Sequence, residues 1–311
     1  MKNEVGLKLI SMELGVSITT VSRALRDCSD ISESMKAKVR EKAVELKYTP
    51  NVLARSLVTG KSNFICVVVD SMKSPFFSVI VDELSVKLKN RGYNVCLLPV
   101  SNRFLERNNV KEAASIGAAA IISFLAPHKD AVEYAILLDK PLLIFGRGCE
   151  EQMVNKIYTD DIRGGEIAAE YLHKLGHKKL MYVGAEIHEV SGIRQRGFIS
   201  KAKELGIDDI VVSQNDENEM FNYIKEGYKG IFCFDDQLVM QILSKVPQSE
   251  IDVVGFNGLF KNFAFNYYFS FPSISSNYSN MTDDAVNILI EQINTDGNYK
   301  YFDKKYDVEI V

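Results

Sequence analysis

Four polar side chains lie on one face of a short helix predicted near the N-terminus. Ser17 is a typical helix-capping residue, and Val21 and Leu25 are spaced to form one buried stripe. At 100° per residue, the side chains that point away from this stripe are Thr19, Ser22, Arg23 and Arg26. Because arginine can form a bidentate hydrogen bond with guanine in the DNA major groove, this face could read bases. The alternative is an ordinary solvated helix face.

Other groups of polar residues do not form a catalytic pattern. His173 and His177 are four residues apart, but no third metal ligand lies near them in the sequence. Adjacent carboxylates point in different directions and so make no general acid/base pair; they are Asp160-Asp161 and Asp235-Asp236. Gly146-Arg147-Gly148 lacks the third glycine of a dinucleotide fingerprint. We therefore expect no enzymatic activity, no metal site and no cofactor.

Three short helices must position the N-terminal polar face. Leu7, Ile10 and Leu14 recur at helical spacing, and Gly15 then interrupts the pattern before the helix that Ser17 caps. Ser32 can cap a third helix, which Thr49-Pro50 ends. A helix, a glycine turn and a second helix make a helix-turn-helix, in which the second helix can enter a major groove about 12 Å wide.

From Phe64 onward, short continuous apolar runs alternate with amphipathic segments, and Thr59-Gly60-Lys61-Ser62 before them has the composition of a linker. Strands without polar alternation are buried on both faces, which indicates parallel sheets covered by helices. The predicted strands are 64–69, 95–100, 118–125, 142–145, 180–183, 210–212, 231–234 and 253–256. Eight strands in a segment of about 250 residues suit two doubly wound α/β subdomains better than one.

Composition and charge narrow the class of protein. With 311 residues, 46% of them hydrophobic, the chain is not disordered or collagen-like, and its five cysteines are scattered without a metal-binding spacing. No apolar run reaches the roughly 18 residues of a spanning helix, so we expect no membrane association and a cytoplasmic protein at the nucleoid. Residues 1–61 hold eleven Lys and Arg against seven Asp and Glu, a charge of +4, which leaves −8 for the rest of a chain whose net charge is −4. This asymmetry suggests that only the N-terminal segment meets a polyanion.

Motifs along almost the whole chain resemble the lactose-repressor/galactose-repressor (LacI/GalR) family. In the N-terminal segment the matches are residues 15–25 (GVSITTVSRAL), Tyr48-Thr49-Pro50-Asn51, Ala54-Arg55-Ser56-Leu57 and residues 59–62. Family landmarks then follow in the family's order: residues 74–77 (SPFF), 91–93 (RGY), Asp160-Asp161 with Gly164, 175–177 (LGH), 194–198 (RQRGF), Asp235-Asp236 and 254–256 (VGF). The resemblance implies a ligand-controlled DNA-binding transcriptional regulator, most simply a repressor.

In the N-terminal helix-turn-helix and hinge segment, the resemblance implies base reading by Ile18, Thr19 and Arg23. It also implies a hinge leucine, Leu57, that wedges into the minor groove. An apolar wedge unstacks a base step and kinks the duplex, which is favourable if more protein surface then reaches the DNA. The residues expected at the DNA are Ser17, Ile18, Thr19, Thr20, Ser22, Arg23, Asn51, Ala54, Arg55 and Leu57. Ile18 could instead belong to the edge of the buried stripe, and Gly6 stands where the family usually has a capping threonine.

In the core, the resemblance implies two periplasmic-binding-protein-like subdomains with an effector in the cleft between them. The expected effector residues are Ser71, Phe77, Arg147, Asp160, Arg194, Asp235 and Asn257. Arg194 matches the family arginine that holds hydroxyls or a carboxylate; as a surface arginine at a helix N-terminus it would need an anionic partner. Asp235 could equally be a helix cap. Asn257 stands where the family usually has Asp, so the sequence is compatible with either a sugar or a sugar phosphate as the effector.

The expected layout is a helix-turn-helix domain at 1–50, a hinge helix and linker at 51–61, and a core at 62–311. Within the core, 62–159 with 278–298 and 160–277 with 299–311 form the N- and C-terminal subdomains, so the chain crosses near Asp160, Asn277 and Tyr299. We expect a homodimer on a pseudo-palindromic operator and a carbohydrate effector. Two rivals are an exported sugar-binding protein or enzyme sharing the core fold, and a regulator that uses a protein corepressor instead of a small effector.

Overall fold

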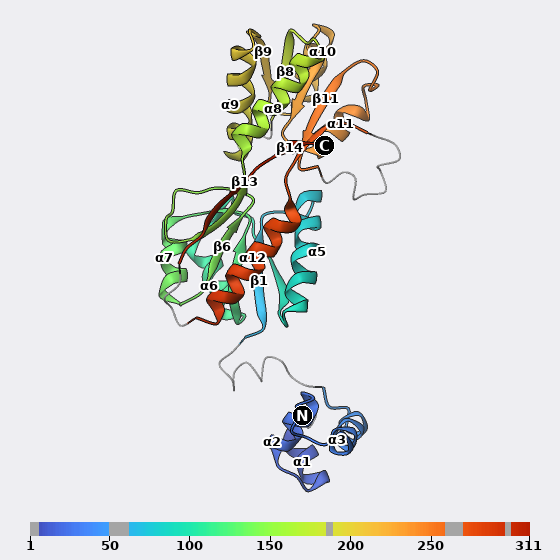
Figure 1. Ribbon diagram of the computed structural model, residues 1–311, viewed down its shortest axis with the longest axis vertical. Coiled ribbons are helices and arrows are strands. Elements are labelled where there is room, and N and C mark those ends of the chain that lie inside the picture. The colour runs from blue at the N-terminus through green and yellow to red at the C-terminus, as the bar shows by residue number, and fades with distance from the viewer. Residues whose placement is uncertain (1–5, 50–61, 185–188, 259–269, 296–299) are drawn as a thin grey trace. The chain divides into compact units, whose positions relative to one another are not determined.

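The computed structural model (Figure 1) describes residues 6–49, 62–184, 189–258, 270–295 and 300–311, and the chain divides into two compact units, Met1–Lys61 and Ser62–Val311. The first unit contains α1 (Leu7–Leu14), α2 (Ile18–Leu25) and α3 (Glu33–Glu45). Gly15 ends α1 at φ 64°, a conformation that glycine adopts without strain. The Ser17 and Ser32 side chains cap α2 and α3 as predicted, accepting hydrogen bonds from the Thr20 and Met35 amides at 3.0 and 3.4 Å.

A small core holds these three helices together. Ile10, Val21, Ala24 and Val39 are fully buried, and they come from all three helices. This packing orients the opposite face of α2 toward solvent. Gly6 precedes α1 without a side-chain cap, as its residue type requires.

The described residues of the second unit form two six-stranded sheets. The first is entirely parallel and has the order β13-β7-β6-β4-β1-β2. Its strands are β1 (Phe64–Val69), β2 (Asn94–Pro99), β4 (Ala118–Ser123), β6 (Leu142–Phe145), β7 (Asn155–Thr159) and β13 (Asp303–Tyr306). Helices α5 (Pro75–Asn90) and α12 (Tyr278–Ile293) cover one face, and α6 (Arg107–Ser115) and α7 (Lys129–Leu137) cover the other.

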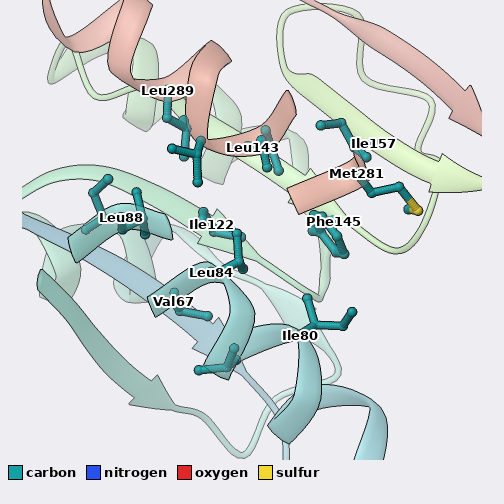
Figure 2. Close-up of a cluster of buried hydrophobic side chains, with 14 of the residues drawn as sticks. Val67, Ile80, Leu84, Leu88, Ile122, Leu143, Phe145, Ile157, Met281 and Leu289 are labelled. Atoms are coloured by element: carbon teal, nitrogen blue, oxygen red, sulfur yellow. The ribbon is translucent and has the colours of Figure 1, made fainter. Parts of the chain in front are cut away.

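Burial on both faces explains why these strands are continuously apolar. In Figure 2, Leu84 and Leu88 of α5 and Leu289 of α12 pack with strand residues such as Val67 and Ile122. Cys66 and Ile121 point to the opposite face, under α6 and α7. A two-stranded parallel ribbon, β3 (Phe104–Leu105) with β5 (Ala126–Pro127), lies outside the main sheet.

The second sheet has the order β14-β12-β11-β10-β8-β9, and it is parallel except for β14 against β12. Its strands are β8 (Lys179–Val183), β9 (Asp209–Ser213), β10 (Gly230–Cys233), β11 (Asp252–Phe256), β12 (Ser273–Ser275) and β14 (Glu309–Ile310). Helices α8 (Asp161–Lys174) and α9 (Glu189–Glu204) cover one face, and α10 (Glu217–Lys225) and α11 (Asp236–Leu243) cover the other.

The two sheets define two subdomains joined by three chain crossings. The first lies between Thr159 of β7 and Asp161 of α8, and the second between Ser275 of β12 and Tyr278 of α12. The third lies at residues 307–308, so the prediction of a crossing near Tyr299 is wrong. The physical reason is that β13 pairs in parallel with β7, which keeps residues 303–306 in the N-terminal subdomain.

Candidate DNA-reading face and effector cavity

The exposed face of α2 consists largely of the residues that the sequence assigned to DNA. Ser17, Ile18 and Thr19 are exposed, while Thr20, Ser22 and Arg23 are half-buried. Ile18 is 46% exposed, so it belongs to the outer face rather than to the stripe made by Val21 and Ala24. The remaining predicted DNA residues, Asn51, Ala54, Arg55 and Leu57, lie outside the described residues.

Arg23 is held by a carboxylate that the sequence reasoning missed. Its Nη2 lies 2.7 Å from Oδ2 of Asp30, in the loop between α2 and α3. The hydrogen bond raises the pKa of Arg23 and lowers the pKa of Asp30. Nothing in the spacing of these residues signals the pair, because the intervening loop determines where Asp30 lies.

A cavity of about 230 Å³ lies between the two sheets of the core, at the carboxyl ends of their strands. Such ends are where parallel α/β folds bind ligands. Six of the seven predicted effector residues line it: Ser71, Phe77, Arg147, Arg194, Asp235 and Asn257. Further lining residues were not predicted: Asp70, Ser74, Phe76, Phe124, Phe145, Gly146, Thr159, Val190, Phe234 and Tyr278.

Arg194 lies on α9, buried, and is fixed by contacts on several sides. Its Nε donates to Oδ1 of Asp161 at 2.8 Å, and its Nη1 donates to the carbonyl of Phe234 at 2.6 Å. The guanidinium carbon lies 3.4 Å from the centre of the Phe256 ring. Asp161 is therefore the anionic partner that an arginine at this position needs. Burial raises the pKa of Asp161, and the charge of Arg194 opposes that shift.

Arg147 and Asp235 bring opposite charges to the same cavity. Burial lowers the pKa of Arg147, against the opposing effect of Glu189 and Asp70. Burial raises the pKa of Asp235, whose side chain also accepts the Leu238 amide at 2.9 Å as the cap of α11. Asp235 is thus both a helix cap and a cavity residue.

Asn257 has an unusual backbone conformation at the cavity wall. Its φ is 100°, in the region that residues other than glycine rarely adopt, and its amide donates to the Ile274 carbonyl at 2.7 Å. The hydroxyl of Tyr278 donates to its Oδ1 at 3.4 Å, which links the end of β11 to the start of α12 across the second crossing. Strained residues cluster at ligand-binding sites, and this one lies at such a cavity.

An aromatic cluster forms the N-terminal-subdomain wall of the cavity. The Phe76 ring contacts the rings of Phe77 and Tyr278 edge-on, each with centroids 5.6 Å apart, and Phe77 lies 5.1 Å from Phe124. Of these, only Phe77 was predicted. The others come from a helix terminus, a strand end and a distant crossing, which only the fold brings together.

Asp160 does not line the cavity, contrary to the sequence prediction. It caps α8 by accepting the Arg163 amide at 3.1 Å, and its other oxygen lies 2.6 Å from Nζ of Lys305 on β13. The residues on either side of Asp160 lie nearer to the site: Thr159 lines the cavity, and Asp161 binds the lining residue Arg194. Successive residues at a helix start point in different directions, which explains the difference.

Neither metal nor membrane features stand out in the described parts of the chain. No group of three or more His, Cys, Asp and Glu side chains there could hold a metal ion. His177 instead pairs with Asp252 through Nε2 and Oδ2 at 2.8 Å. No described helix is long and apolar enough to cross a membrane.

Comparisons with known proteins identify the family of the chain. Residues 7–51 match the family described as "Bacterial regulatory proteins, lacI family", and residues 62–231, over half of the chain, match "Periplasmic binding proteins and sugar binding domain of LacI family". The transcriptional regulator RegA of Clostridium saccharobutylicum is 26% identical over 93% of this chain and 92% of its own. The sucrose operon repressor of Lactococcus lactis is 24% identical over 93% of this chain and 94% of its own.

Solved structures show the same fold. The lac repressor dimer bound to operator and the anti-inducer ONPF matches with a TM-score of 0.80 and 20% identity, over 99% of this chain and 98% of its own. A LacI-family regulator from Enterococcus faecium with bound ribose matches with a TM-score of 0.67 and 19% identity, over 80% of this chain and 96% of its own. The relatives are regulators rather than enzymes. The chain therefore belongs to the lacI family of bacterial regulatory proteins and is a DNA-binding transcriptional regulator.

Proposed function

We propose that this regulator acts as a homodimer that represses transcription at a pseudo-palindromic operator and is controlled by a carbohydrate of monosaccharide size. The observation that supports control by a small effector is the cavity between the two core subdomains. At about 230 Å³ it is smaller than the roughly 300–1,000 Å³ of pockets for drug-sized ligands, so it suits a small effector.

The chemistry of the cavity suits a polyhydroxylated ligand. The aromatic wall of Phe76, Phe77 and Phe124 offers apolar surface to the C–H face of a sugar ring. Arg147 and Arg194 supply hydrogen-bond donors, and the carboxylate of Asp235 supplies acceptors for hydroxyl groups. Because positive and negative side chains both line the cavity, we favour a neutral sugar.

A sugar phosphate is the second candidate, and Arg147 favours it. Burial lowers the pKa of this arginine, which means that its charge is poorly solvated. A phosphate group beside it would stabilise that charge through a bidentate hydrogen bond.

Control of DNA binding would follow from subdomain closure. Three parallel crossings favour a hinge motion, and a ligand that contacts both subdomains favours one closure state. A hinge at 51–61 is too short to be a stable helix alone, so its folding would depend on the DNA and on the partner hinge. In this proposal Asn51, Ala54, Arg55 and Leu57 contact DNA there. Because the cavity offers a site for a small effector, we favour control by such an effector over control by a protein corepressor.

Thermal unfolding of the full chain with D-ribose, D-xylose, D-glucose and their phosphate esters tests the proposal. A ligand at 100 times its Kd stabilises the protein by about 2.7 kcal/mol and raises the melting temperature by several degrees. Arg194→Ala should abolish that shift, while Arg163→Ala, which changes an exposed arginine on α8, should keep it. A shift with phosphate esters alone would favour the second candidate. If the compound that shifts the wild type shifts Arg194→Ala equally, Arg194 is not an effector residue.

A further inference from the structure

The Arg23–Asp30 pair places a negative charge on the face that is proposed to meet DNA. Both side chains are partly exposed, at 43% for Arg23 and 50% for Asp30. An acidic group here repels phosphates and weakens binding to any DNA sequence. A carboxylate at this position is therefore unfavourable for DNA binding unless it also contributes to recognition.

The loop that carries Asp30 is held in a defined position relative to α2. The Cys28 amide donates to the Arg23 carbonyl at 3.1 Å, and the Ile31 amide donates to the Cys28 carbonyl at 3.2 Å. Asp27 also ties the loop to α3, because its Oδ1 lies 2.8 Å from Nη2 of Arg40. Asp30 is thus supported from both helices.

The rest of the Arg23 side chain is restrained as well. Its Nε is buried and has no hydrogen-bond partner among the described residues. The stem is therefore covered, and the Nη end of the guanidinium is the part that reaches outward. Nη2 has two hydrogens, and the contact with Asp30 uses one of them.

We propose that Asp30 is a specificity-determining residue that acts through Arg23. Its carboxylate holds the guanidinium in one orientation, in which the remaining N–H groups can meet the O6 and N7 acceptors of a guanine. An arginine that is already ordered loses less conformational freedom when it binds, so the correct base is favoured over others. This inference rests on the proposed base reading by Arg23.

The two effects of Asp30 have opposite signs, which makes the proposal testable. The full chain is used to select duplexes from a random library, in parallel with Arg23→Ala, Asp30→Asn and the control Glu45→Gln. Glu45 is a suitable control because it is also an exposed carboxylate of the same domain paired with a cation, Lys42, but that pair lies within α3 rather than in the loop that carries Asp30. Binding to the wild-type consensus and to a scrambled duplex is then measured at one salt concentration.

Arg23→Ala should erase one G·C preference in each half-site, and Asp30→Asn should flatten the same position. Asp30→Asn should also bind the scrambled duplex a few times more tightly, and its ratio of consensus to scrambled affinity should fall roughly tenfold. Glu45→Gln should keep the wild-type consensus.

Three results would overturn the inference. If Asp30→Asn keeps the consensus and only binds all duplexes more tightly, its carboxylate is merely repulsive. If Arg23→Ala keeps the consensus, Arg23 reads no base and Asp30 cannot act through it. If the wild-type chain selects no consensus at all, the proposed operator recognition itself fails.

Discussion

The buried ion pair between Arg194 and Asp161 connects the cavity between the subdomains to the first subdomain crossing. Asp161 is the first residue of α8, and its Oδ1 also accepts the Thr159 hydroxyl at 3.3 Å. The two side chains are only 6% and 4% exposed, so neither charge is well solvated without the other. Removing one partner of such a pair leaves an uncompensated buried charge.

We expect Asp161→Ala to destabilise the protein by about 3–5 kcal/mol, the usual cost of breaking a buried ion pair. Arg194→Ala should be similarly costly, but the double variant should cost much less than the sum, because no unpaired charge remains. Urea unfolding of the four proteins gives the coupling energy. The exposed pair Arg163–Glu166 is the control, with an expected coupling below about 1 kcal/mol. Additive effects at Arg194 and Asp161 would show that the pair is not coupled.

Residue roles could be predicted where the interaction is local. Ser17 and Ser32 were recognised as caps because each acts on an amide three residues away. The partner of Arg194 lies 33 residues away in sequence, and only the crossing of α8 and α9 brings it close. The prediction of Asp160 as a cavity residue was wrong for the same reason, because the fold places Thr159 at the cavity and Asp161 beside Arg194.

The crossing of α8 and α9 depends on glycines, because the two helices approach at backbone distance. A Cβ added to Gly197 would overlap the Ile162 carbonyl, and one added to Gly165 would overlap the Arg194 carbonyl. Since Arg194 lies one turn before Gly197, this close approach also brings its side chain to Asp161. The element contact and the cavity geometry are therefore linked.

We expect Gly197→Ala to destabilise the core by several kcal/mol, since the methyl group meets backbone that cannot move aside. Gly192→Ala on the same helix is the matched control. Its Cβ would meet only Nη1 of Arg196 at 3.7 Å, so the higher helix propensity of alanine should leave it neutral or stabilise it by about 1 kcal/mol. Urea midpoints compare the two variants. Equal stability would contradict the proposed backbone contact.

Strands were predictable from sequence where both faces meet hydrophobic side chains. All eight apolar runs became strands within one or two residues of their predicted starts. The strand β7 was missed because its polar side chains are buried by partners elsewhere in the chain. Asn155 exchanges two hydrogen bonds with Gln292, at 2.8 and 3.0 Å, and Lys156 pairs with Asp303 at 2.9 Å.

At the scale of the molecule, the net charge and the two candidate binding sites are divided between the same two parts of the chain. The segment of residues 1–61 has a charge of +4 and contains the lacI-family domain, while the remaining residues have a charge of −8 and contain the cavity. The two-subdomain core was predictable because the strands of each sheet appear in the sequence as several apolar runs. The third crossing was not, since β13 (Asp303–Tyr306) contains three charged residues and reads as surface.

This division predicts how DNA binding depends on salt. Each contact between a cation and a phosphate releases counterions, so the logarithm of the affinity falls linearly with the logarithm of the salt concentration. Arg26→Ala, which removes an exposed arginine of the N-terminal domain, should reduce the magnitude of that slope by about 1 if Arg26 contacts a phosphate.

The control is Lys129→Ala, which removes an exposed lysine of the core, 75% accessible, and makes the same change in net charge. Because salt screens charges that do not touch the DNA, its slope should equal that of the wild type. Titrations of the consensus duplex from 50 to about 300 mM salt distinguish contacts from net charge. Equal changes in both slopes would mean that overall charge, rather than the N-terminal domain, sets the attraction to DNA.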